Sequence, residues 1–119
     1  MKIGIIISTN EPETIYNAFR FANFSIKKEE KNEIKIFLIG QGVEIEDNNY
    51  FTIEIKGKKF DIMAEVKEFI SLKGELFSCG TCVKIRQEYL RGYKMEICPI
   101  STMQDMYDIV KWSEKLITF

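Results

Sequence analysis

The feature that most constrains the fold of this chain is its opening run, Lys2–Ser8, which is almost entirely apolar and contains four isoleucines. Such a run is typical of a strand that is buried on both faces of a parallel sheet. Residues suited to a helix start follow it, with Pro12 in place for the first turn. Apolar residues then recur at helical spacing as far as Lys28, and Glu33–Ile39 returns to a strand pattern. The chain therefore opens with a predicted βαβ unit.

The alternation of strands and helices continues along the rest of the chain. The further predicted helices are Phe60–Leu72, Val83–Arg91 and a last one that ends near Trp112, and the further predicted strands are Glu75–Ser78, Met95–Ile100 and Lys115–Phe119. In the helices we expect Ile70 and Val110 to face the core. The last helix should be capped by Ser101 or Thr102, because Thr102 and Asp105 approximate a capping box. Short links between alternating elements indicate an α/β fold, in which helices cover both faces of a mostly parallel sheet of about five strands.

The segment Val43–Lys59 is the least regular part of the pattern. Tyr50–Ile55 alternates like a strand, and Lys56–Lys58 is a candidate turn after it. Gly40–Gly42 ends the second strand, but it lacks the third glycine of a dinucleotide-binding loop and does not clearly open a helix. A nucleotide site is therefore not expected at these glycines.

Length and composition narrow the class of protein. The 119 residues suit a single domain over residues 1–119, and the 45% of hydrophobic residues can fill a core. A formal net charge of -1 gives no general attraction to nucleic acid or to an acidic membrane surface. No apolar stretch approaches the roughly 20 residues of a membrane span. The start shows no signal-peptide pattern and the cysteine count is odd, which favours reduced thiols in the cytoplasm.

The clearest chemistry lies in Leu76–Cys82, an apolar run that ends in a C-x-x-C motif. The motif puts Cys79 at the tip of a predicted strand and at the start of the predicted helix that follows. Unpaired backbone N–H groups and the helix dipole favour an anion at such a place, and a thiolate is an anion. The chain has no histidine, so any activation must come from the helix, from backbone N–H groups, or from Lys84 and Arg86.

In a parallel sheet, ligands gather beyond the carboxyl ends of the strands. Four segments are expected to meet there: Ser8–Asn10, Gly40–Gly42, Cys79–Cys82 and Pro99–Met103. Within them, Gly80 allows close approach of the backbone to a substrate, and Thr81 offers a hydroxyl.

Three other interpretations of the cysteines compete with that of a reactive thiol. Free cysteines are often simply buried, and this is the expectation for Cys98 in its apolar surroundings. C-x-x-C is also half of many zinc sites, but the second half is missing, so no metal is expected. A thioredoxin-like pair would follow the first strand of a βαβ unit, whereas Cys79 and Cys82 follow the third clear strand.

The chain resembles the DsrE family of small sulfur-relay proteins, the group that includes DsrE, DsrF, DsrH and TusD. The segments that carry the resemblance are Lys2–Ser8, Phe37–Val43, Phe60–Val66 with Lys73–Leu76, Ser78–Cys82, Ser101–Met103 and Lys115–Phe119. Of these, the cysteine element is the specific part. The resemblance implies a three-layer α/β/α domain that accepts sulfane sulfur as a persulfide on Cys79. It also implies sulfur donor and acceptor proteins as partners, and a homo-oligomer, either a trimer or a hexamer.

The sequence therefore predicts a cytoplasmic sulfur carrier in which Cys79 is the nucleophile and Cys82 is a possible resolving thiol. The residues expected to shape the substrate site are Ser78, Gly80, Thr81, Ser101 and Thr102. No cofactor is expected, because a thiolate itself carries the sulfur. One alternative is an oligomeric binding or regulatory module with inert cysteines. The other is a thiol–disulfide redox protein that uses the same two thiols.

Overall fold

A single parallel sheet organises the chain. The computed structural model describes residues 1–46, 52–89 and 99–119. The sheet strands are β1 (Lys2–Ile7), β2 (Glu33–Leu38), β5 (Glu75–Cys79), β6 (Ile100–Ser101) and β7 (Lys115–Thr118). They lie in the order β6-β5-β2-β1-β7, and every neighbouring pair is parallel. The predicted five-stranded, mostly parallel sheet is confirmed.

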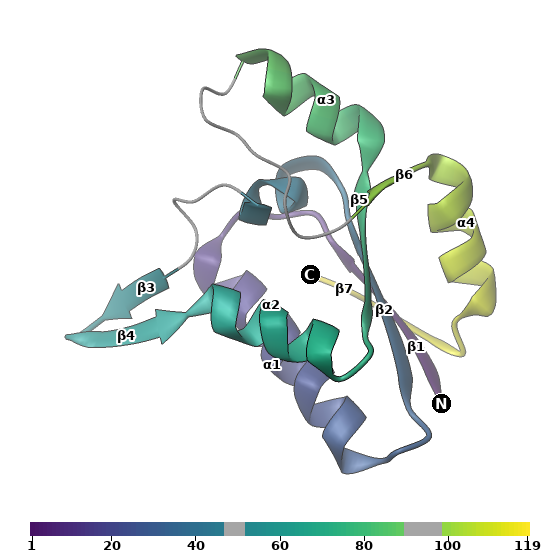
Figure 1. The fold of residues 1–119 in the computed structure, drawn as a ribbon, viewed down its shortest axis with the longest axis horizontal. Helices are drawn as coiled ribbons and strands as arrows, with labels where there is room; N and C mark the ends of the chain where they lie inside the picture. Colours follow the sequence, from purple (N-terminus) through teal and green to yellow (C-terminus); the bar gives the residue numbers. More distant parts are fainter. Residues whose placement is uncertain (47–51, 90–98) are drawn as a thin grey trace.

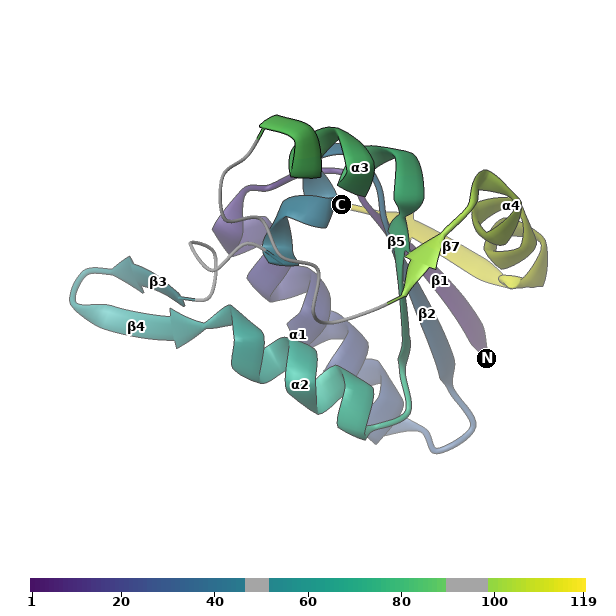
Figure 2. The ribbon, with the colours of Figure 1, turned by 45° about the horizontal axis from the view of Figure 1, so that its top comes forward.

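Helices cover both faces of this sheet. The helices are α1 (Pro12–Lys28), α2 (Ile62–Ser71), α3 (Gly80–Tyr89) and α4 (Met103–Trp112). Figures 1 and 2 show α1 and α2 on one side of the sheet and α4 on the other, while α3 extends beyond the carboxyl end of β5. The expected three-layer α/β/α arrangement is therefore present.

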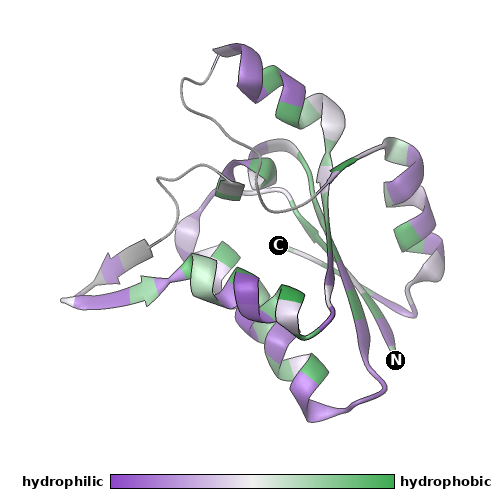
Figure 3. Cartoon of the chain, viewed as in Figure 1, coloured by the Kyte–Doolittle hydropathy of each residue, from purple (hydrophilic) through white to green (hydrophobic). Residues whose placement is uncertain are grey.

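The core lies mainly between the sheet and the α1–α2 layer. Alternate residues of β1, such as Ile5 and Ile7, are fully buried on the same side as the apolar stripe of α1. The rings of Phe19 and Phe69 meet edge to face between the two helices, with their centroids 5.7 Å apart. In Figure 3 the central strands are largely hydrophobic, as burial on both faces requires.

Helix ends follow their capping residues. Glu11 precedes α1 and accepts hydrogen bonds from the backbone N–H groups of Glu13 and Thr14. At α4 the predicted capping box is confirmed: the Thr102 hydroxyl accepts from the Asp105 N–H, and the Asp105 carboxylate accepts from the Thr102 N–H.

The irregular region between β2 and α2 contains a 3-10 helix and a hairpin, which the sequence pattern predicted only in part. A 3-10 helix, η1 (Gly40–Glu46), begins directly after β2, so the expectation that these glycines do not open a helix was wrong. An antiparallel hairpin follows, made of β3 (Thr52–Ile55) and β4 (Lys58–Asp61). Its turn confirms the predicted one: Lys56 and Gly57 both have positive φ, as in a two-residue type I′ turn. Tyr50, at the start of the predicted strand, lies outside the described residues.

Several predicted boundaries and faces differ from the structure. Phe60 pairs with Ile53 in the hairpin, so α2 begins at Ile62 instead, with Asp61 as its cap. The side chains of Ile70 and Val110 were expected in the core but are exposed. Of the predicted strand Met95–Ile100, residues 95–98 lie outside the described residues. None of the described helices is long and apolar enough to cross a membrane.

Candidate functional site

The first thiol of the motif lies at the junction between β5 and α3. Cys79 is the last residue of β5, and Gly80 begins α3, so the predicted position at a strand tip and a helix start is confirmed. The helix starts earlier than the predicted Val83. Cys79 is only 5% exposed, because β6 pairs beside it with Ser101 in register. A Cβ atom at Gly80 would lie 2.5 Å from Ile100 Cγ2, so this close approach favours glycine.

The second thiol lies within the first turn of α3 and is partly exposed. The backbone N–H of Gly40 donates a hydrogen bond to Cys82 Sγ over 3.2 Å. Burial raises the pKa of the Cys82 thiol, and a hydrogen bond with Cys79 raises it further. The Gly40 N–H and the Arg86 charge act in the opposite direction, since both favour an anionic sulfur. The balance of these effects raises the pKa of the Cys82 thiol above its ordinary value.

A buried ion pair lies beside Cys82. Both Nε and Nη2 of Arg86 are 3.0 Å from Glu44 Oε2, and the Arg86 and Glu44 side chains are 8% and 14% exposed. The Nη1 group of Arg86 also donates to the Cys82 carbonyl over 3.3 Å. The other carboxylate oxygen, Glu44 Oε1, accepts from Asn10 Nδ2 over 3.2 Å. These bonds join the loop after β1, the 3-10 helix η1 and the helix α3 into one network.

The predicted meeting of segments at the carboxyl edge of the sheet is visible in the backbone contacts. The Ile39 N–H donates to the Ile7 carbonyl over 3.0 Å as the chain enters η1. A Cβ atom at Gly42 would collide with that same carbonyl, so η1 approaches β1 more closely than any side chain allows. At the far side of β1, the Ser8 N–H donates to the Phe119 carbonyl over 2.9 Å.

The residues predicted to bind substrate occupy different environments. Ser78 and Ser101 are buried in adjacent strands, where Ser101 is paired with Cys79. Thr81 is exposed on the first turn of α3. Thr102 is also exposed, but its hydroxyl and N–H are both engaged with Asp105 at the start of α4. Four of these residues therefore neighbour Cys79: Ser78, Gly80 and Thr81 in the chain, and Ser101 through strand pairing. Their role toward a substrate stays a prediction.

Reasoning from the sequence identified Arg86 as a possible source of activation for the thiol, but it missed Glu44. Glu44 lies in the stretch with no readable period, and 42 residues separate it from Arg86. The sequence offered one signal for this pair. An acidic residue stands four positions after Gly40, and an arginine stands one helical turn after Cys82. Cys98 lies outside the described residues, so its predicted burial is untested.

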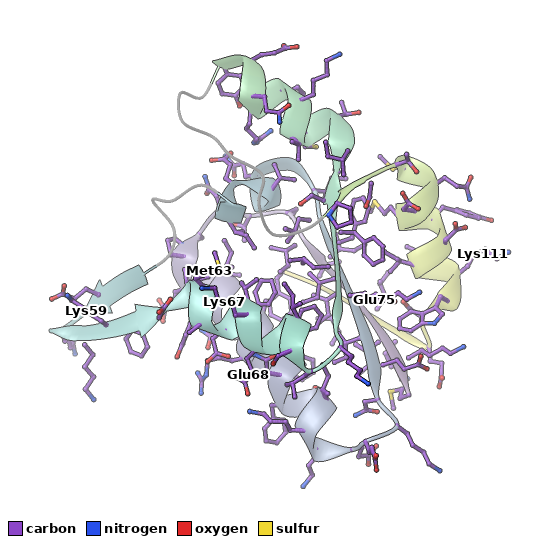
Figure 4. The ribbon with its side chains drawn as sticks, viewed as in Figure 1. Lys59, Met63, Lys67, Glu68, Glu75 and Lys111 are labelled. Atoms are coloured by element: carbon purple, nitrogen blue, oxygen red, sulfur yellow. The ribbon has the colours of Figure 1, made fainter. Side chains whose placement is uncertain are left out.

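Two further observations concern a hollow in the surface and the residues that could bind a metal ion. A hollow of about 370 Å³, whose lining includes Lys35, Trp112 and Glu75, lies at the opposite edge of the sheet and therefore does not serve the thiols. Figure 4 labels Glu75, the first residue of β5, at that edge. Within residues 1–46, 52–89 and 99–119, no three side chains of the histidine, cysteine, aspartate or glutamate type gather to hold a metal ion.

Comparisons with known proteins identify the family. The YchN protein from E. coli superposes with a TM-score of 0.76 at 18% identity, covering 100% of both chains. A conserved protein of unknown function, BT1422 from Bacteroides thetaiotaomicron, gives a TM-score of 0.73 at 16% identity, covering 99% of this chain and 94% of that one. A search of curated protein sequences finds no significant match. The model of the DsrE/DsrF-like family matches residues 1–119, and the chain therefore belongs to the DsrE/DsrF-like family.

Proposed function

We propose that the protein is a sulfur carrier of the sulfur-relay type, which holds sulfane sulfur as a persulfide on Cys79. The observation that carries the proposal is the pair of free thiols at the junction of β5 and α3, with Cys79 ending the strand and Cys82 in the first turn of the helix. Cys79 stands directly before Gly80, the first residue of α3, which is the position that the sequence predicts for the reactive thiol. Membership of the DsrE/DsrF-like family supports the same chemistry.

The loading step is a simple displacement. The Cys79 thiolate attacks the outer sulfur of a donor persulfide, the donor sulfur–sulfur bond breaks, and the donor leaves as a thiolate. Cys79 then carries one additional sulfur atom, and no electron donor or acceptor is consumed. Cys82 remains a thiol beside it, because burial and the contact with Cys79 favour its protonated form.

A second candidate function arises from the same pair of thiols. If Cys82 attacks the inner sulfur of a persulfide on Cys79, a disulfide forms between the two cysteines and sulfide leaves. The sulfane sulfur is then reduced and the two thiols are oxidised, so an external thiol must reduce the pair before the next cycle. This reaction defines the thiol–disulfide alternative, and its product is an internal disulfide instead of a stable adduct.

Intact-mass measurement after incubation with inorganic polysulfide tests the proposal. We expect the wild type to gain about 32 Da per sulfur atom bound as a persulfide. Cys79→Ser should abolish the gain, and Cys82→Ser should keep it, with a longer lifetime if Cys82 resolves the persulfide. Cys98→Ser is the matched control and should load like the wild type.

Each other outcome points to a different function. An adduct that survives Cys79→Ser shows that another cysteine is the acceptor. A mass loss of two hydrogens, with free sulfide in solution, favours the thiol–disulfide reaction. No adduct in the wild type favours the binding or regulatory module with inert cysteines.

Assembly and partners belong to the same proposal. We expect sulfur donor and acceptor proteins as partners, a cytoplasmic location, and a homo-oligomer that is a trimer or a hexamer. Exposed apolar side chains on α4, at Met103, Tyr107 and Val110, follow helical spacing and support self-association. Light scattering coupled to size exclusion measures the assembly, and a monomer at micromolar concentration would contradict this part.

A further inference from the structure

The network beside Cys82 contains an ion pair whose burial needs an explanation. Arg86 and Glu44 are both nearly enclosed, at 8% and 14% side-chain exposure. Charges withdrawn from water lose solvation, and a buried pair is often no more stabilising than apolar side chains of the same size. By contrast, the pair between Lys27 and Glu68 lies in the open, at 55% and 38% exposure, and carries no such cost.

Both members of the buried pair belong to segments that contact the sulfur of Cys82. Arg86 follows Cys82 by one turn of α3, and its Nη1 donates to the Cys82 carbonyl. Glu44 belongs to η1, the segment that opens with Gly40, and the Gly40 N–H is the group that donates to Cys82 Sγ. The pair therefore fastens the helix that carries the thiol to the segment that carries its hydrogen-bond donor.

We infer that Arg86 and Glu44 are positioning residues for the thiol site: beyond fastening η1 to α3, the buried pair sets the charge balance at Cys82 Sγ, with Arg86 favouring and Glu44 opposing negative charge on that sulfur. The inference rests on the proposed function only in that Cys82 lies beside the thiol that carries the sulfur. The two side chains are not nucleophiles, and they act through Cys82.

The charges around Cys82 give the two residues opposite effects. From α3, the Arg86 guanidinium favours an anionic sulfur, and the nearby Lys84 is exposed to solvent. From η1, the Gly40 N–H also favours the anion, while the Glu44 carboxylate neutralises Arg86. From β5, the Cys79 sulfur opposes a second negative charge. Loss of the Arg86 charge must therefore disfavour the Cys82 thiolate, and loss of the Glu44 charge must favour it.

The experiment measures the alkylation rate of Cys82 against pH, resolved by peptide mass spectrometry, in variants of the whole chain. The Arg86 charge lowers the pKa of the Cys82 thiol, so we expect its removal to change the alkylation rate at neutral pH by about threefold. Arg86→Gln should slow the reaction, Glu44→Gln should accelerate it, and Arg86→Lys should recover part of the wild-type rate. Lys27→Gln and Glu68→Gln remove charges from the exposed pair and should leave the rate unchanged.

A purely structural role gives a different pattern. Loosening of η1 from α3 exposes Cys82 in both Arg86→Gln and Glu44→Gln, so both would react faster, and that result overturns the inference. Unchanged rates in both overturn it as well. If Arg86→Gln does not fold, Arg86→Lys decides, because it keeps the charge and alters the contacts: a rate at or below that of the wild type supports the charge role, and a faster rate overturns it.

Failure of this inference and failure of the proposed function are distinguishable. Alkylation needs no sulfur donor, so opposite rate changes with no persulfide loading would refute the carrier and leave the positioning role intact. Persulfide loading together with parallel rate changes would do the reverse.

Discussion

The buried pair of Arg86 and Glu44 should behave very differently from an exposed pair when either member is removed. Arg86→Met leaves the Glu44 carboxylate without its two nitrogen contacts at 3.0 Å, and Glu44→Leu leaves the guanidinium equally unpaired. Breaking one side of a buried pair costs about 3–5 kcal/mol, because an uncompensated charge remains inside. The 14% exposure of Glu44 lets some water reach the site, so we expect values near the lower end.

The double variant Arg86→Met with Glu44→Leu should recover most of that loss. With both charges gone, apolar side chains of similar size fill the space, and the net change falls to roughly 0–2 kcal/mol. The single variants should lower Tm by roughly 10 °C in a domain of this size, since 1 kcal/mol corresponds to about 3–6 °C. Urea unfolding followed by circular dichroism gives the free energies, and the four proteins form a double-mutant cycle.

The exposed pair on α1 and α2 is the matched control for this cycle. Lys27→Met and Glu68→Leu break a contact of 2.8 Å, but both side chains remain largely hydrated. Coupling between such residues is about 0–1 kcal/mol. If Arg86 and Glu44 show the same small coupling, or if their single losses simply add in the double variant, the pair is effectively solvated and the argument from burial is wrong.

Three further predictions concern other parts of the fold. Gly42→Ala would push a Cβ atom into the Ile7 carbonyl, so we expect a loss of about 1–3 kcal/mol or more in urea unfolding, as for other overpacked sites. The Thr102 N–H and hydroxyl hold the pKa of Asp105 below its usual value, so its carboxylate stabilises the folded state at neutral pH. Asp105→Asn should therefore lower Tm at pH 7, and the difference should vanish as the pH falls below about 4 and through the lower folded pKa. At alkaline pH a bulky maleimide should label the partly exposed Cys82 well before the buried Cys79, because access limits the reaction, and equal labelling would contradict the burial of Cys79.

The fold was predictable because its signals are local. The isoleucine run of β1, the stripe of α1 and the capping box at Thr102 each lie within one element and each follow a known period. The errors fall where elements meet. Phe60 suits the start of a helix, yet it pairs in the hairpin as a strand residue, and Ile70 lies on a helical face that the described residues leave partly exposed.

The site was predictable to the extent that one motif defines it. The C-x-x-C spacing places two thiols within one turn of a strand–helix junction, and the structure confirms this position for both of them. The contacts made by Gly40 and Glu44 were not predictable, because η1 has no amphipathic period and reaches α3 only through the folded sheet. Only the expected convergence of Gly40–Gly42 with the cysteine turn pointed toward them.

Which thiol is exposed depends on a part of the chain far from the motif. Cys79 and Cys82 stand three residues apart, and nothing in the intervening Gly80 and Thr81 distinguishes their access to solvent. The distinction comes from β6, which pairs Ser101 with Cys79 and closes that side of the junction, whereas Cys82 lies beyond the strand on α3. The side chain of Cys79 is therefore shielded from solvent, and Cys82 is the more accessible thiol. If Cys79 carries sulfur as proposed, the strand order of the sheet shields that sulfur, so the pairing of β6 matters to the site as much as the motif itself.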